Sequence, residues 1–142
     1  MKQFIVMQNG KTKISIPITD IKEIVLKESI TKVPNMPDYM VGVQNIRGEI
    51  INVIDIKKFL NIQDDVESKK IVICILEDKM IGLLTEEVSE IIKLETENLK
   101  DIKEMLDISD NNFYDKITTY NDEPIIIADI KKLKNTWSRE VQ

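Results

Sequence analysis

Any chemistry in this chain would have to come from serine, lysine, cysteine and carboxylate side chains, because the sequence contains no histidine. That absence removes histidine-based acid–base catalysis, histidine metal ligands and a histidine phosphorelay. Two elements of a serine acyl-enzyme pattern are present, Ser29-Ile30-Thr31-Lys32 and Ser109-Asp110-Asn111. The third element, Lys-Thr-Gly, is missing, and Ser29 does not open a convincing helix. We therefore expect no serine-based catalysis.

The other reactive groups also favour structural roles. Asp64-Asp65 and Glu86-Glu87 could in principle form an acid–base pair or hold a divalent cation. Neighbouring residues on a strand or loop point apart, however, so we expect solvated surface carboxylates. Cys74 lies in the apolar run Ile71 to Leu76, which predicts a buried structural thiol rather than a nucleophile. With four glycines and one cysteine, the chain has neither a phosphate loop nor a metal-binding motif. The sequence thus predicts a protein without a cofactor that is not an enzyme.

Composition narrows the class of protein further. A chain of 142 residues fits one domain or two tightly joined lobes. A hydrophobic fraction of 42% with 32% charged residues excludes a disordered polyelectrolyte and a membrane protein. The net charge of −5, with interspersed lysines and carboxylates and only 5% aromatic residues, argues against nucleic-acid binding and against membrane attachment. Met1-Lys2-Gln3-Phe4 lacks the features of a signal peptide, which predicts a cytoplasmic protein.

These residues belong to two copies of one pattern. Phe4-Ile5-Val6-Met7 returns as Ile71-Val72-Ile73-Cys74, and the stretch from Glu49 to Lys58 returns as the stretch from Glu123 to Lys132. Each copy reads as a hairpin, a short helical turn, a strand, a second hairpin and a short helix, which begins at an N-cap aspartate, Asp55 or Asp129. Chance matching of isoleucine-rich strands is the alternative, but the shared order of elements favours a duplication.

Turn residues place the elements within the first copy. Asn9-Gly10 between alternating apolar residues predicts a hairpin. Thr19 or Asp20 could cap the short helical turn, and Pro37 and Gly42 suit the start and stop of a brief helix over residues 36–41. Gly48 supplies the positive φ of a tight turn after Arg47.

The pattern as a whole predicts a mainly β protein. Several short strands without a long amphipathic helix between them imply small closed or nearly closed β-barrels. Leu99, Ile102 and Leu106 are spaced as one helical face in the second copy. No Pro/Gly/Ser-rich linker separates the copies, so we expect one domain over residues 1–142. It contains two pseudo-repeated β-barrel lobes within residues 3–134 and a C-terminal tail over 135–142.

The segment from Asn45 to Ile56 resembles the signature of CheW-type coupling domains, which runs from Asn-Leu/Ile-Arg-Gly to Asp-Leu/Ile. Other segments are similar to that family as well: Ile21-Lys22-Glu23-Ile24, Val33-Pro34-Asn35, Pro37 to Val43, Ile81 to Ile91 and Ile125 to Ile130. Glu86 departs from the family pattern, because it stands where an aspartate is usual. The resemblance spans about residues 3–134.

This resemblance implies a fold of two intertwined five-stranded SH3-like β-barrels with short helices. It also implies a non-enzymatic adaptor of chemotaxis signal transduction. Such an adaptor binds the regulatory domain of the histidine kinase CheA, which has the same fold, and the cytoplasmic tip of methyl-accepting chemotaxis proteins. Two alternatives stay open: a coupling module of a non-motility chemosensory array, and a small-molecule-binding β-barrel with convergent polar groups in a pocket.

The resemblance also implies roles for individual residues. Ile21, Glu23 and Arg47 match positions of receptor binding, and Ile30 and Gly42 match positions of kinase binding. Glu23 and Arg47 are expected to form a partly buried ion pair that holds the first helical turn against the second hairpin.

Overall fold

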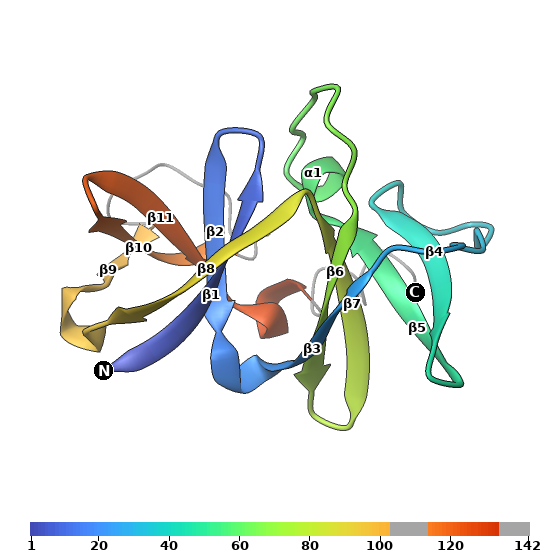
Figure 1. Ribbon diagram of the computed structural model, residues 1–142, viewed down its shortest axis with the longest axis horizontal. Coiled ribbons are helices and arrows are strands. Elements are labelled where there is room, and N and C mark those ends of the chain that lie inside the picture. The colour runs from blue at the N-terminus through green and yellow to red at the C-terminus, as the bar shows by residue number, and fades with distance from the viewer. Residues whose placement is uncertain (103–113, 134–142) are drawn as a thin grey trace.

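The computed structural model describes residues 1–102 and 114–133, and β-strands make up most of this part of the chain (Figure 1). The strands are, in chain order, β1 Lys2–Asn9, β2 Thr12–Pro17, β3 Ile21–Leu26, β4 Met40–Ile46, β5 Glu49–Asp55, β6 Lys70–Leu76, β7 Lys79–Thr85, β8 Glu87–Leu94, β9 Lys100–Asp101, β10 Tyr114–Tyr120 and β11 Glu123–Ala128. The short helical elements include α1 Ile56–Phe59 and the 3₁₀ turns η1 Ile18–Asp20 and η2 Thr96–Asn98. The predicted mainly β class with short helices is confirmed.

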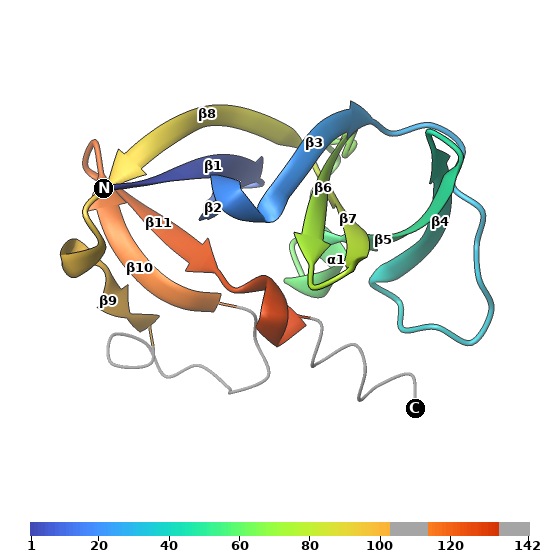
Figure 2. The same cartoon turned by 90° about the horizontal axis from the view of Figure 1, so that it is seen from below.

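The strands form two sheets that lie side by side along the long axis of the molecule (Figures 1 and 2). The first sheet has the order β8-β1-β2-β11-β10-β9, and the second has the order β3-β6-β7-β5-β4. Most neighbours are antiparallel, whereas β11 pairs with β2 and β5 pairs with β7 in parallel.

The two copies of the sequence pattern exchange strands between these sheets. The hairpin β1–β2 of the first copy pairs with β8 and β11 of the second copy, and the hairpin β6–β7 of the second copy pairs with β3 and β5 of the first. A hairpin alone is marginally stable in water, and an unpaired strand edge exposes backbone donors and acceptors. Each copy therefore completes its sheet only with strands of the other copy.

The ladders of the described residues leave both sheets open, so they do not show the closed five-stranded barrels that we expected. The edge strands are β8 and β9 in the first sheet and β3 and β4 in the second. After β3 the chain follows a long connection, which forms an isolated β-bridge to β4 between Thr31 and Val43. Because β3 ends at Leu26, it forms no continuous ladder with β4.

Two local expectations were wrong and one was confirmed. The helix over residues 36–41 is absent, because the chain makes a turn there and β4 begins at Met40. η1 follows Pro17 and has no side-chain cap from Thr19 or Asp20. Both N-cap aspartates are present: Asp55 Oδ1 accepts the N–H of Lys57 at 2.9 Å, and Asp129 Oδ1 accepts the N–H of Lys131 at 2.9 Å. Leu106 and the tail over residues 135–142 lie outside the described residues.

The largest core cluster spans both sheets. It contains Met7, Ile14 and Ile16 of the first sheet together with Ile54, Val72 and Leu83 of the second. Each sheet also has its own smaller cluster. Cys74 is fully buried in the shared cluster, which confirms the structural thiol, and burial raises its pKa well above the ordinary value. The two sheets therefore share one apolar interior.

Candidate functional site

The predicted site residues lie where β3 and β4, the two edge strands of the second sheet, approach each other, a region that we call the β3–β4 junction. We use this name for residues 21–31, which are β3 and the segment that continues it, and residues 40–49, which are β4 and its turn into β5. Ile21 and Glu23 lie on β3, Ile30 lies in the continuing segment, Gly42 lies on β4 and Arg47 lies in the turn. Figure 2 shows β3 leading into the connection that returns to β4. The structure thus brings the residues of both predicted sites to the two edge strands of one sheet.

An ion pair joins these edges at the β4–β5 turn. Arg47 Nε donates to both carboxylate oxygens of Glu23, at 3.1 Å and 3.2 Å. The pair differs from the expected one in its position, because Glu23 lies on a strand rather than in a helical turn and the Arg47 side chain is 76% exposed. Arg47 and Gly48 both have positive φ, which is typical of a two-residue hairpin turn. The ion pair therefore connects the turn to β3 across a gap that no ladder bridges.

Ile30 and Gly42 meet at the other end of the junction. A Cβ atom on Gly42 would lie 2.2 Å from the carbonyl oxygen of Thr31 and 2.8 Å from Cγ2 of Ile30. Gly42 also has a φ of +143°, a conformation that residues with a side chain rarely adopt. Ile30 packs against the core cluster of the second sheet. Glycine is required here because the segment after β3 passes directly over the β4 backbone.

Ile21 lies where the chain enters the second sheet from η1. It is half-buried against the core cluster that both sheets share, and its β3 ladder partner is Cys74. A bulge between Ile21 and Glu23 interrupts the ladder at this point. The residue is thus held at the boundary between the sheets.

Sequence reasoning missed Gln44, a buried polar residue of β4 with 3% exposure. Its Oε1 accepts the N–H of Glu28 at 2.9 Å, and its Nε2 donates to the carbonyl of Leu26 at 3.3 Å. A hollow of about 200 Å³ lies beside it between the two edge strands, lined by residues that include Val25, Ile46 and Arg47. No local signal marks Gln44, because its partners follow β3, far away in the sequence.

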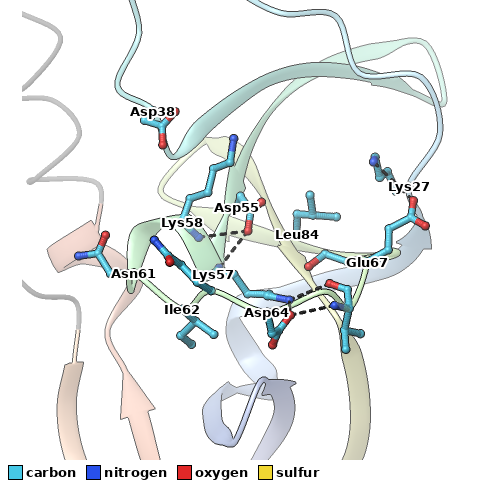
Figure 3. A pocket seen from close by; sticks show the side chains of 13 residues that line it. Lys27, Asp38, Asp55, Lys57, Lys58, Asn61, Ile62, Asp64, Glu67 and Leu84 are labelled. Atoms are coloured by element: carbon cyan, nitrogen blue, oxygen red, sulfur yellow. Dashed lines mark hydrogen bonds and ion pairs between the residues drawn. The ribbon is translucent and has the colours of Figure 1, made fainter.

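A second missed feature is a charge network around Lys57 of α1. The Lys57 ammonium group donates to the carboxylates of Asp64 and Glu86 and, at 2.8 Å, to the carbonyl of Val66. Figure 3 shows the Lys57 and Asp64 side chains pointing toward each other. The expectation of a solvated carboxylate was wrong for Glu86, since only 9% of its side chain is exposed, whereas Asp64 lies at the exposed surface as expected. Lys57 follows a helix cap, so its sequence context resembles that of an exposed helical lysine.

The surroundings shift the pKa values of this network in opposite directions. Burial acts to lower the pKa of Lys57, but hydrogen bonds to Asp64 and Glu86 outweigh it and the pKa is raised. The hydrogen bond from Lys57 lowers the pKa of Asp64 below its ordinary value of 3.8. Both groups are therefore held in their charged forms.

The network also connects the two sheets. Glu86 Oε1 accepts the N–H of Gly10 at 3.1 Å, which reaches the β1–β2 turn of the first sheet. Asn9 Oδ1 accepts the Thr85 hydroxyl at 2.9 Å and the N–H of Glu86 at 3.2 Å. Glu86, at the point where the chain passes from β7 to β8, thereby fastens the first hairpin to the second sheet.

A hollow of about 520 Å³ adjoins this network and is lined by charged and polar residues (Figure 3). Its central charged groups serve the fold, because Lys57 is surrounded by acceptors and Asp55 caps α1. Within residues 1–102 and 114–133, no cluster of three or more His, Cys, Asp or Glu residues could hold a metal ion. In the same residues, no helix has the length and apolar character needed to cross a bilayer.

Comparisons with known proteins agree in sequence and in structure. Residues 3–136 match the family model described as a CheW-like domain. The chain is 25% identical over 134 residues to the chemotaxis protein CheW of Klebsiella aerogenes, covering 93% of this chain and 81% of that protein. It is 30% identical over 105 residues to chemotaxis protein CheW of Bacillus subtilis, covering 72% and 67%. The crystal structure of the scaffolding protein TtCheW from Thermoanaerobacter tengcongensis superposes with a TM-score of 0.83 at 30% identity, covering 91% of this chain and 84% of that one.

Replacing Gly42 with alanine should destabilise the protein by about 2–4 kcal/mol, because it adds both backbone strain and a steric clash with Thr31. Gly48→Ala is the matched control, since Gly48 also has positive φ but a Cβ there would meet no atom within 4 Å. That control should cost only about 1–2 kcal/mol. Urea unfolding of both variants measures the difference, and equal losses would show that the close approach at Gly42 is unimportant.

Replacing Lys57 with methionine should lower Tm by roughly 10 °C, because Asp64 and the poorly solvated Glu86 lose their shared cation. The control is Lys58→Met on the same short helix, where the side chain is exposed and the change should be small. Calorimetry of the two variants makes the comparison. A Tm for Lys57→Met that equals that of the control would contradict a stabilising network.

The stabilisation by Lys57 should also depend on pH. A carboxyl group whose pKa is lowered by folding stabilises the folded state above its ordinary pKa, and this contribution disappears as pH falls through the folded-state pKa. The difference in Tm between wild type and Lys57→Met should therefore be full at pH 7 and shrink as pH falls below the ordinary Asp64 value of 3.8. A difference that stays constant down to acid pH would assign the effect to packing instead.

Proposed function

Because the chain belongs to the CheW-like family of non-enzymatic chemotaxis adaptors, we propose that it couples methyl-accepting chemotaxis proteins to the histidine kinase CheA. The proposal places it in the cytoplasm, at receptor arrays on the inner face of the membrane. Receptor binding is assigned to Ile21, Glu23 and Arg47, and kinase binding is assigned to Ile30 and Gly42.

The observation that carries this proposal is the arrangement of these residues at the β3–β4 junction. The Glu23–Arg47 ion pair lies at one end of the junction, and the contact between Ile30 and Gly42 lies at the other. Two partners could therefore be held at a fixed separation by one pair of strands. Coupling by such a protein is the transmission of relative position, which requires a rigid connection and no reaction.

We further propose that each sheet acts as a small β-barrel. The edges of β3 and β4 have no ladder between them, but contacts from Gln44, Thr31 and Arg47 draw them together. Strand edges of this kind are suited to contact with another sheet. The regulatory domain of the kinase, which the family resemblance gives the same fold, is the partner we assign to the end of the junction at Ile30 and Gly42.

The small-molecule alternative has less support. Aliphatic side chains such as Ile14, Ile54 and Leu83 fill the interior between the sheets. In the charged hollow beside α1, Lys57 and Asp55 already form ion pairs and hydrogen bonds within the protein. A barrel that binds a ligand needs convergent polar groups that are available to that ligand. The non-motility chemosensory module differs from the main proposal only in its pathway.

Calorimetric titration tests the proposed function. The wild-type protein should bind the regulatory domain of CheA and a receptor signalling fragment, each in a defined stoichiometry. Arg47→Ala should weaken receptor binding by about tenfold, since exposed arginines are common interface anchors, and should leave kinase binding unchanged. Its Tm should stay within about 3 °C of wild type, because exposed ion pairs contribute little to stability.

Asn121→Ala provides the matched control for Arg47→Ala. Asn121 begins the β10–β11 turn of the other sheet and has a φ of +52°, close to the +54° of Arg47, but it carries no charge. This variant should bind the receptor fragment as wild type does. An unaltered receptor affinity for Arg47→Ala would remove Arg47 from the receptor site, and no binding of wild type to either partner would refute the proposed function.

A further inference from the structure

The Gln44 side chain forms hydrogen bonds between β4 and the end of β3, where the second sheet has no main-chain ladder. Its amide spans from the carbonyl of Leu26 to the N–H of Glu28, in the way a neighbouring strand would. On the opposite side of the same segment, the N–H of Lys27 donates to the carbonyl of Lys69 at 2.8 Å. Residues 26–28 are thus held from both sides, by β4 on one side and by Lys69, the residue before β6, on the other.

The other sheet provides a comparison within the same molecule. Thr118 holds the place in β10 that Gln44 holds in β4, because each pairs with an isoleucine of the following strand, Ile125 and Ile51. A threonine hydroxyl is too short to span between two backbone groups of a neighbouring strand. The gap beside Thr118, toward β8, is a hollow of about 570 Å³, against about 200 Å³ beside Gln44. The side-chain bridge therefore belongs to the second sheet, where both predicted sites lie.

Gln44 also lies between those two sites. Toward the turn, Arg47 pairs with Glu23, and toward the start of β4, Val43 and Thr31 exchange two backbone hydrogen bonds of 2.8 Å. Along the chain, a movement of β3 at Glu23 reaches Ile30 through residues 26–28, which Gln44 holds. Because Gln44 is buried, it offers no surface to either partner.

We propose that Gln44 is a positioning residue, which fixes the distance between the receptor-binding and kinase-binding residues and so transmits the state of the receptor to the kinase. The inference rests on the proposed function. It adds that transmission depends on a buried amide that contacts neither partner. Loss of the amide leaves each binding surface present but loosens the segment between them.

The test uses the full chain with a receptor signalling fragment and the complete kinase. Gln44→Met keeps the length of the side chain and removes both hydrogen bonds. We expect it to bind each partner alone within about twofold of wild type, since its effect on either surface is indirect. The receptor-dependent change in kinase autophosphorylation, measured at saturating adaptor, should fall about fivefold or more, the size of a typical coupling between sites. Hydrogen exchange of the Glu28 amide should become faster.

Two further variants complete the test. Thr118→Val is the control in the other sheet and should retain the full kinase response. Gln44→Asn keeps a buried amide but is too short to reach both partners, so it should lose the response as Gln44→Met does, and it carries the test if Gln44→Met does not fold.

The outcomes separate the inference from the proposed function. A wild-type protein that binds neither partner contradicts both. Wild-type binding and response, together with a full response in the Gln44 variants, overturn only the positioning role. Failure of both Gln44 variants to fold, or to bind one partner alone, also overturns it, because Gln44 would then be a structural residue only.

Discussion

Backbone hydrogen bonding at strand edges determines how this chain folds. A strand at the edge of a sheet leaves a row of donors and acceptors that must find partners or water. Each copy of the duplicated pattern is left with such edges, and the ladders β1–β8 and β3–β6 satisfy them by exchange. The exchange explains why the two sheets share one apolar core, and why β3 and β4, which gain no ladder to each other, rely on the side chains of Gln44 and Arg47.

The two copies have diverged at the positions that matter for the proposed function. In the first copy Glu23 pairs with Arg47, whereas Asn121 takes the place of Arg47 in the second and carries no charge. Gln44 of the first copy likewise has Thr118 as its counterpart. Both contacts hold β3 against β4, and among the described residues this charged pair and this amide bridge belong to the second sheet. This asymmetry agrees with the proposal that both partners bind at the second sheet.

Sequence reasoning was most successful where the controlling interactions are local. Hairpin turns and the N-cap aspartates Asp55 and Asp129 depend on residues close in sequence, and the structure contains them. The prediction of a helix over residues 36–41 was wrong. Pro37 precedes a turn, and Gly42 allows the segment after β3 to pass closely over the β4 backbone. Gln44 and the Lys57 network were missed, since their partners are distant in sequence and a buried lysine has no local signature.

The central claim is that one adaptor molecule holds receptor and kinase at the same time. Light scattering on a size-exclusion column measures this directly, with equimolar wild-type adaptor, receptor signalling fragment and CheA regulatory domain. The account predicts a single species with the summed mass of all three components. Only binary complexes, in which an excess of one partner displaces the other from the adaptor, would contradict it.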